Sequence, residues 1–442
     1  MSTTANALAL SLIYYIMEAP GYHVDAMTGV FSRAALAPLL SEMEFRKRRC
    51  SLLFFPVRDF QLVNHALGMK NGDRVLTDLS SYIKRSFPRG YTLRLAGPVF
   101  GVLLPDAEPY DKDSLWTLYS SMPGEFYADA IPVHLDISLV CINSESMDGT
   151  AETLATVESV LALYREEELP KVLLCDESFR SQLLQNKALE LALARALNNG
   201  GLSVYYQPIH NCERKLVALE ALVRLYDPEY GALPTQEAVE AAEQNGSIDR
   251  LGWQVLQKVC RFIEKNDATT WGLDHIGVNL SAVQCMQPDL ADSILKIREE
   301  YRVPPSLLAF EITETATGSI DMLHLNMERL CDAGFFFLLD DFGKGNANLS
   351  HIARLPFHCV KIDKDILWSA KESEAKRLLL AGVIRLVNDM ELKSVCEGVE
   401  TEEQLELLQR QGVSMLQGYL FSKPLSEDDL LSYIKAQGGR GE

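Results

Sequence analysis

After Gly201 the chain alternates short apolar runs with longer helical patterns, and this rhythm constrains its fold more than any other feature. The apolar runs lie at 203–206, 217–225, 276–280, 308–312, 336–339, 359–362, 394–396 and 415–420. Strands that alternate with helices are typical of α/β proteins, and eight such units predict a (β/α)8 barrel. A doubly wound open sheet is the competing arrangement, because it is built from the same repeating units.

The preceding part of the chain has a different pattern. Apolar runs at 51–57, 91–95, 100–104, 133–141 and 171–175 alternate with amphipathic helical stretches, which predicts an α+β domain. Residues 180–198 are rich in Ala and Leu and are followed by Asn199-Gly200-Gly201, a combination that predicts a helix with a C-terminal stop. We therefore expect an α+β domain with a short N-terminal helix at 1–176, a connecting helix at 177–198 and the barrel at 199–442.

Charge and cysteine usage exclude several classes of function. The chain carries 61 acidic and 42 basic residues, for a net charge of -19, which argues against DNA, RNA or an anionic membrane surface as the main partner. The apolar stretch 8–17 is too short to span a bilayer, so we expect a packing helix there. Nine scattered cysteines without a CxxC pair disfavour disulfides or a zinc site and indicate the reducing cytoplasm.

Acidic and amide residues lie in or directly after the predicted barrel strands. They are Glu220, Asn279, Glu311, Asp340, Asp341, Asp363, Glu397 and Glu400, with Lys361 among them. The carboxyl ends of barrel strands meet at one rim, where carboxylates roughly 4 Å apart repel each other by about 4 kcal/mol per pair. Each acid by itself could be a solvated loop residue or a helix N-cap, but six of these residues in register, five carboxylates and the amide of Asn279, predict bound cations. Oxygen ligands without His or Cys favour Mg²⁺ or Mn²⁺, and two ions sharing a carboxylate suit attack on a phosphodiester.

The same segments, in order, resemble the EAL-type cyclic di-GMP phosphodiesterases from about Ala192 to Ile434. The matching stretches are YQPI at 206–209, EALVR at 220–224, NLS at 279–281, EITE at 311–314, DDFG at 340–343, KID at 361–363, EGVE at 397–400 and QGYLFSKP at 417–424. Eight ordered segments over more than two hundred residues make the resemblance specific. It implies hydrolysis of cyclic di-GMP to linear pGpG with two Mg²⁺ or Mn²⁺ ions, in a protein that we expect to be a homodimer.

The resemblance also implies a role for each matching residue. One ion would be held by Glu220, Asn279, Glu311 and Asp340. The second would be held by Asp340, Asp341 and Glu397, with Asp340 as the bridge. The catalytic residues would be Glu220, Asp341, Lys361 and Glu397, of which Lys361 positions the attacking water. The substrate would be bound by Gln207, Leu222, Arg224, Glu400 and Gln417. Glu314, and in part Glu400, would act indirectly by orienting a loop or a ligand.

One loop departs from the family pattern. After Asp341 the family reads roughly Phe-Gly-Thr-Gly-Tyr-Ser-Ser, whereas this chain has Lys344 at the Thr position and Asn346-Ala347-Asn348 further on. A cation beside the second metal ion would repel it, so we expect slow hydrolysis or a preference for Mn²⁺, and a faster Lys344→Thr variant. The altered loop favours the alternative, a catalytically silent cyclic di-GMP receptor or protein-interaction module, while the complete ligand set argues against it.

Residues 20–176 resemble, more faintly, the GGDEF diguanylate cyclase domain, which begins with a turn like Asp25–Gly29 here. The two positions at which that family has metal-binding acids are Pro56 and Pro98, and Arg58 replaces a further acid. We therefore expect no cyclisation of GTP, which contradicts a bifunctional cyclase–phosphodiesterase. The guanine-reading positions remain, as Asn64 and Asp73, which suggests a regulatory site for GTP. The alternative is that both are turn-forming residues in a domain used for dimerisation or partner docking.

Overall fold

A computed structural model describes residues 24–146, 149–165, 169–313, 320–344 and 354–438. Two compact units divide the chain, Met1–Gln185 and Asn186–Glu442, and each is described by itself. The helix predicted at 8–17 lies outside the described residues. Within the described residues, none of the helices combines the length and apolar character that crossing a bilayer would require.

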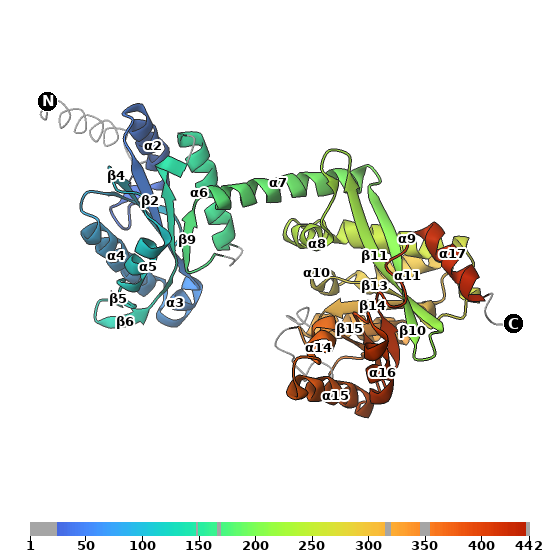
Figure 1. Cartoon of the computed structure of the whole chain (residues 1–442). Coiled ribbons are helices and arrows are strands. Elements are labelled where there is room, and N and C mark those ends of the chain that lie inside the picture. Colours follow the sequence, from blue (N-terminus) through green and yellow to red (C-terminus); the bar gives the residue numbers. More distant parts are fainter. Residues whose placement is uncertain (1–23, 147–148, 166–168, 314–319, 345–353, 439–442) are drawn as a thin grey trace, which may run out of the picture. The chain divides into compact units, whose positions relative to one another are not determined.

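The first unit is built around one mixed sheet, in the order β1-β3-β4-β2-β8-β9, with β7 added beside β2. Its strands are β1 Phe31–Ser32, β2 Cys50–Arg58, β3 Tyr91–Ala96, β4 Val99–Pro105, β7 Asp136–Ile137, β8 Leu139–Asn143 and β9 Val172–Cys175. A separate hairpin is formed by β5 Glu125–Ala128 and β6 Ile131–His134. The helices are α2 Leu36–Phe45, α3 Phe60–Leu67, α4 Met69–Ser86, α5 Lys112–Ser120 and α6 Thr150–Arg165 (Figure 1).

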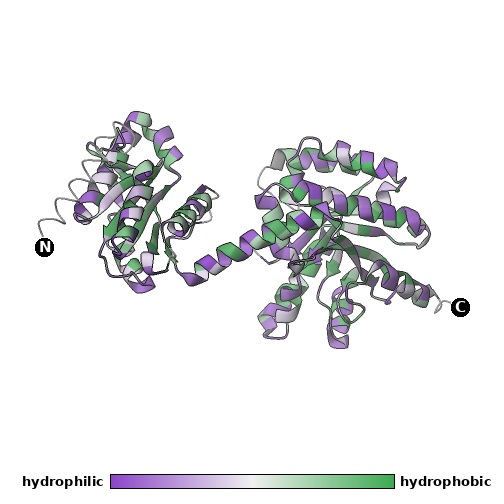
Figure 2. Ribbon diagram, turned by 90° about the horizontal axis from the view of Figure 1, so that it is seen from above, coloured by the Kyte–Doolittle hydropathy of each residue, from purple (hydrophilic) through white to green (hydrophobic). Residues whose placement is uncertain are grey.

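The central strand β2 is buried on both faces because its residues alternate between two hydrophobic cores. Leu52 and Phe54 belong to the core that contains buried residues of α2 and α6. Leu53 and Phe55 belong to the other core, which contains buried residues of α4 and Leu115 of α5. The unit therefore has three layers, helix–sheet–helix, as period-2 alternation in a fully buried strand requires. Figure 2 shows apolar residues along the strands and mixed polar and apolar residues along the helices.

The prediction of a single strand at 133–141 is wrong, because three strands cover this region. β6 pairs with β5, β7 pairs with the end of β2, and β8 pairs with its beginning. The break between β7 and β8 falls at Ser138, whose backbone N–H donates to the carbonyl of Pro56. Proline has no backbone N–H, so it interrupts the ladder of β2 at this point.

The predicted helix at 180–198 is present as α7, Glu177–Asn198. Its bounds are those expected for the connecting helix, 177–198, and it ends before Gly200, which has a φ of 75°. That left-handed conformation suits glycine and stops a helix. The division between the two compact units falls inside α7, and the domain boundaries given above stay a prediction.

The second unit is a closed barrel of eight strands, which confirms the predicted barrel and excludes the open sheet. The ring order is β10-β18-β17-β16-β15-β14-β13-β11, and β10 pairs with β11 to close it. The strands are β10 Leu202–Asn211, β11 Leu216–Asp227, β13 His275–Asn279, β14 Leu308–Thr313, β15 Phe336–Phe342, β16 Cys359–Ile362, β17 Lys393–Cys396 and β18 Met415–Gln417. A short strand, β12 Gly231–Ala232, extends β11.

The barrel differs from a regular (β/α)8 barrel in its first strand. β10 runs antiparallel to both β11 and β18, while the other barrel pairs are parallel. The reason is that only residues 212–215 connect β10 to β11, which is enough for a hairpin but far too short for the crossover that parallel strands need. The helices of this unit are α8 Thr235–Gln244, α9 Ile248–Lys265, α10 Ala282–Cys285, α11 Leu290–Glu300, α12 Ile320–Asp332, α14 Lys364–Ser369, α15 Glu374–Asp389, α16 Glu402–Gln411 and α17 Glu427–Gly438.

Candidate functional site

The ammonium group of Lys361 lies among four carboxylates at the carboxyl ends of the barrel strands. Its Nζ is 2.6 Å from Glu311 Oε2, 2.9 Å from Glu397 Oε1, 3.0 Å from Asp340 Oδ1 and 3.3 Å from Glu220 Oε2. Lys361 and Glu311 are each only 1% exposed. The parallel register of β11, β13, β14, β15, β16 and β17 brings these side chains from distant parts of the sequence to one rim.

Two amide side chains hold the carboxylate of Glu220 in place. Gln417 donates from Nε2 to Glu220 Oε2 at 2.5 Å, and Asn279 donates from Nδ2 to Glu220 Oε1 at 3.3 Å. Gln207 is paired with Glu220 across the β10–β11 ladder, so its side chain is brought to the same end of the barrel. Hydrogen bonds to both oxygens fix the orientation of Glu220 before any ligand arrives, as a binding site requires.

Glu311 occupies space that exists only because residue 277 is a glycine. A Cβ atom at position 277 would lie 1.9 Å from Glu311 Oε1, so any side chain there would displace the carboxylate. Gly277 lies inside β13, two residues before Asn279. Glycine in a strand interior often marks a close approach of another group. A glycine within the predicted strand 276–280 was therefore the sequence signal for this contact with Glu311.

Asp340 and Asp341 lie in an irregular part of β15. The pairing register with β16 shifts between Leu339 and Phe342, and Asp341 has a left-handed φ of 54°. Aspartate adopts this conformation more readily than most residues, and bulges beside functional sites re-aim side chains. As a result, Asp340, Asp341 and Glu397 each present an oxygen, and these oxygens lie within 4.8 Å of one another.

The four carboxylates carry more negative charge than one ammonium group can offset. Burial raises the pKa of Glu397 to about 7, with repulsion from Asp340 and Glu220 adding to the rise and Lys361 opposing it. Burial also raises the pKa of Glu311 well above its usual range. Desolvation acts against the charge of Lys361, but the surrounding carboxylates outweigh it and raise the pKa of this ammonium group well above its ordinary value.

We expected bound metal ions alone to neutralise the acids, but the ammonium group of Lys361 offsets part of their negative charge. Its ammonium group lies at the centre of Glu220, Glu311 and Asp340, three of the four residues predicted, with Asn279, to hold the first ion. Among the described residues, the buried Glu311 Oε1 and Asp340 Oδ1 nevertheless have no hydrogen-bond partner, although Asp340 Oδ1 is in ion-pair range of Lys361. Unpartnered carboxylate oxygens beside Asp341 and Glu397 are donors that fit a hard divalent cation.

A cavity of about 300 Å³ adjoins the cluster. The predicted site residues that line it are Gln207, Glu220, Leu222, Asp340, Lys361, Glu397, Glu400 and Gln417. Arg224 is not among its lining residues; its Nη1 donates to the carbonyl of Val223, and its guanidinium lies 5.5 Å from the ring centroid of Tyr205. Asp363 serves as the N-cap of α14, where it accepts from the backbone N–H of Asp365. Glu314 lies outside the described residues.

Lys344 stands at the Thr position of the family's loop after Asp341, and the structure places its whole side chain. Its Nζ lies 3.6 Å from Asp341 Oδ2 and its side chain is largely exposed. The cation therefore approaches one of the three carboxylates that the structure brings together. Residues 345–353 lie outside the described residues. The predicted effect of Asn346, Ala347 and Asn348 on hydrolysis therefore stays a prediction.

Sequence reasoning missed one wall of the cavity. Lys364 and Trp368 of α14, Gly398 after β17, and Tyr419 after β18 also line it. Trp368 donates from Nε1 to the carbonyl of Gly398 at 2.9 Å. Trp368 lies outside the segments that match the family. The signal that could have found it is its place on a helix that begins directly after a barrel strand, four residues after Lys364 and so on the same helix face.

In the first unit, the predicted turn Asp25–Gly29 is present. Thr28 donates from N and Oγ1 to Asp25 Oδ1, and Arg94 forms an ion pair with the same carboxylate. Pro98 lines a cavity of about 640 Å³ together with Arg58 and Asn64. Asp73 is exposed on α4 and is not among the residues that line this cavity.

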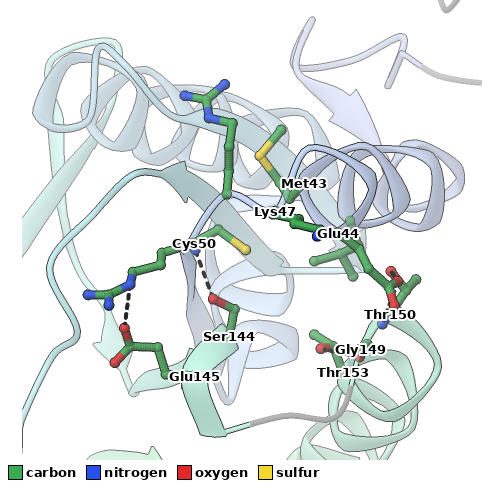
Figure 3. A pocket seen from close by; sticks show the side chains of 12 residues that line it. Met43, Glu44, Lys47, Cys50, Ser144, Glu145, Gly149, Thr150 and Thr153 are labelled. Atoms are coloured by element: carbon green, nitrogen blue, oxygen red, sulfur yellow. Dashed lines mark hydrogen bonds and ion pairs between the residues drawn. The ribbon is translucent and has the colours of Figure 1, made fainter.

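A second cavity of the first unit, about 320 Å³, lies between α2, the start of β2 and the start of α6 (Figure 3). Its arginines are already paired, Arg49 with Glu145 and Arg48 with Asp106. Glu44 accepts hydrogen bonds from the N–H and hydroxyl of Thr150 at the start of α6. Charges that are satisfied within the protein leave this cavity a weaker candidate site than the barrel rim.

Comparison with known proteins finds a matching family model for each unit. Residues 190–424 match the family model of the EAL domain, and residues 22–164 match that of the diguanylate cyclase GGDEF domain, so the two follow each other in tandem. The chain is 28% identical over 398 residues to the bifunctional diguanylate cyclase/cyclic di-GMP phosphodiesterase MucR of Pseudomonas aeruginosa, covering 88% of this chain and 57% of the relative. It is 29% identical over 425 residues to the cyclic di-GMP phosphodiesterase NbdA of the same species, covering 93% and 54%.

The chain thus spans little more than half the length of these relatives. Among solved structures, the PaMucR phosphodiesterase in complex with c-di-GMP is 31% identical, with a TM-score of 0.52. The match covers 55% of this chain and 99% of that chain.

Proposed function

The chain belongs to the EAL domain family, and from this premise we propose that its barrel hydrolyses cyclic di-GMP to the linear dinucleotide pGpG. The observation that carries the proposal is the cluster of Glu220, Glu311, Asp340 and Glu397 around Lys361, beside a cavity of about 300 Å³. A buried excess of carboxylates is costly, and pKa values raised by burial and repulsion are concentrated at sites of chemistry.

The residues of the rim are suited to hold two divalent cations, which we take to be Mg²⁺ or Mn²⁺. Asp340, Asp341 and Glu397 would hold one of them. The other would be held by Glu220, Asn279, Glu311 and Asp340. When bound, such ions lower the pKa of a water molecule and offset negative charge on a phosphodiester.

The chain's own groups prepare the site for a phosphodiester. Lys361 keeps a fixed positive charge beside the cluster, where a phosphoryl group gains negative charge during hydrolysis. Gln417 and Asn279 prevent Glu220 from turning to solvent. Gln207, Leu222 and Glu400 are wall residues that would contact the substrate. A phosphate contact by Arg224 requires its guanidinium to leave the carbonyl of Val223, and that role, like homodimerisation, stays a prediction.

Glu220→Ala should lower the rate of cyclic di-GMP hydrolysis by at least about 100-fold, because it removes a proposed metal ligand together with the acceptor that Gln417 and Asn279 hold. The measurement is chromatographic separation of pGpG from the substrate, with the full chain and Mg²⁺ or Mn²⁺. Glu372→Gln is the control, since Glu372 is an exposed glutamate that pairs with Lys376. Equal rates for Glu220→Ala and the unchanged protein would contradict the assignment.

The alternative function is a silent receptor or protein-interaction module. The position of Lys344 beside Asp341 favours it, because an ammonium group 3.6 Å from a ligand oxygen opposes a second cation at that carboxylate. A receptor would bind cyclic di-GMP and release it unchanged, whatever divalent ion is supplied.

Lys344→Thr should raise the hydrolysis rate at limiting Mg²⁺ by about threefold to tenfold, because the exposed lysine is partly screened by solvent and its repulsion is modest. Titration of the rate with Mg²⁺ and with Mn²⁺ measures the effect, and the gain should shrink as either ion saturates. Lys371→Thr, a change at another exposed lysine, serves as the comparison. A Lys344→Thr variant with an unchanged or lower rate would count against the repulsion.

For the first unit we propose no cyclase activity and a regulatory role for bound GTP. Pro56 and Pro98 offer no carboxylate where the GGDEF family binds metal. Of the two predicted guanine-reading residues, Asn64 lines the cavity and Asp73 does not, and Arg58, which replaces a further acid, lines it as well. The opposing interpretation also has support. A Cβ atom on Gly72 would lie 2.0 Å from Asn64 Oδ1, so packing of α3 against α4 by itself gives Asn64 a structural reason to be there.

Titration calorimetry with GTP should detect binding that does not require Mg²⁺, because the proposed contacts come from Arg58 and Asn64 rather than from metal-bound acids. Asn64→Ala should weaken this binding by about tenfold, the typical cost of one lost hydrogen bond to a buried base. No heat with millimolar GTP, for a protein that otherwise folds normally, would leave the structural interpretation.

A further inference from the structure

One wall of the barrel cavity is aromatic rather than acidic. Trp368 of α14 is 36% exposed and Tyr419, two residues beyond β18, is 58% exposed, yet both line the cavity. Among the described residues neither ring is packed against another aromatic ring. Large aromatic surfaces left open beside a binding cavity are typical of sites that receive a flat apolar ligand.

Trp368 is held in this open position by specific contacts. Its indole N–H donates to the carbonyl of Gly398, and Lys364 Nζ lies 5.3 Å from the ring centroid. Gly398 has a φ of 68°, and a Cβ atom there would lie 2.4 Å from Lys364 Cβ and 3.1 Å from Trp368 Nε1. Only glycine therefore allows the indole to rest on the residue that directly follows Glu397.

We propose that Trp368 is a base-binding residue, whose indole stacks on one purine of the dinucleotide while the adjoining phosphodiester lies at the carboxylate cluster. The inference rests on the proposed function and deepens it by assigning the base-recognition wall. Purine rings stack on indole with a substantial gain in binding, and Lys364, on the same wall, carries a charge suited to the second phosphate. Tyr419, with Lys423 Nζ 5.4 Å from its ring centroid, lies on the same wall and is available to the other base.

A purely structural role for Trp368 gives a different expectation. In that case the indole would matter through its hydrogen bond to Gly398, which helps to position Glu397, and stacking would be irrelevant. Trp368→Phe separates the two roles, because phenylalanine keeps an aromatic face and loses the N–H donor. Trp368→Ala removes both.

The test is steady-state kinetics of the full chain with cyclic di-GMP, and with methyl p-nitrophenyl phosphate as a phosphodiester that carries no nucleobase. Trp368→Ala should raise KM for cyclic di-GMP by about tenfold, in the range that loss of one base–aromatic stack produces, with a smaller change in kcat. The effect on the base-free diester should be at least fivefold smaller. Trp368→Phe should recover most of the KM, and Trp116→Ala, at an exposed tryptophan of the other unit, should leave it unchanged.

Two results would overturn the proposal. One is a Trp368→Phe variant as impaired as Trp368→Ala, which would assign the role to the hydrogen bond with Gly398. The other is an equal loss for both substrates. If the unchanged protein hydrolyses neither substrate, the proposed function fails, and the stack is tested separately by tryptophan fluorescence with cyclic di-GMP and Ca²⁺. Quenching that disappears in Trp368→Phe would support the stack, and quenching that persists would refute it.

Discussion

The ion pairs of Lys361 are the interaction on which the rest of the barrel site depends. A single buried ammonium group contacts carboxylates from four different strands or strand ends, and the closest of them, Glu311, is itself buried. An isolated charge in such surroundings would be expelled or neutralised, so each partner is stable only because the others are present. Repulsion among the carboxylates contributes to the raised pKa values of Glu311 and Glu397, and a further cation at the rim would relieve it.

The structure supports this cluster by backbone devices as well as by charge. Gly277 leaves room for the Glu311 carboxylate, and the irregular pairing after Leu339 turns Asp340 and Asp341 toward Glu397. Gly398, which directly follows Glu397, leaves room for the indole of Trp368, and this indole donates to the carbonyl of Gly398. Each of these features is local. Each makes a strand or a turn less regular, and each places a side chain at the rim.

Much of this arrangement was predictable from the sequence, because barrel strands are short apolar runs and acids at their ends have few other reasons to recur. Glu220, Glu311, Asp340 and Glu397 were expected together for that reason, and the structure brings them together. The reversed direction of β10 was not expected, since direction depends on the short connection at 212–215 rather than on the strand itself. The central place of Lys361, the contact between Gly277 and Glu311 and the position of Trp368 depend on packing across strands, which no local pattern encodes.

The two units differ in the charges that their cavities present. At the barrel rim, acids are retained at successive strand ends. In the first unit, we propose that Pro56 and Pro98 take the positions of metal-binding acids, and the cavity that Pro98 lines presents Arg58. The most direct test of the barrel account is a crystal structure of the full chain soaked with Mn²⁺ and measured at the manganese absorption edge. The account predicts an anomalous peak among Asp340, Asp341 and Glu397. A rim without such a peak, with Lys361 still bound to all four carboxylates, would contradict it.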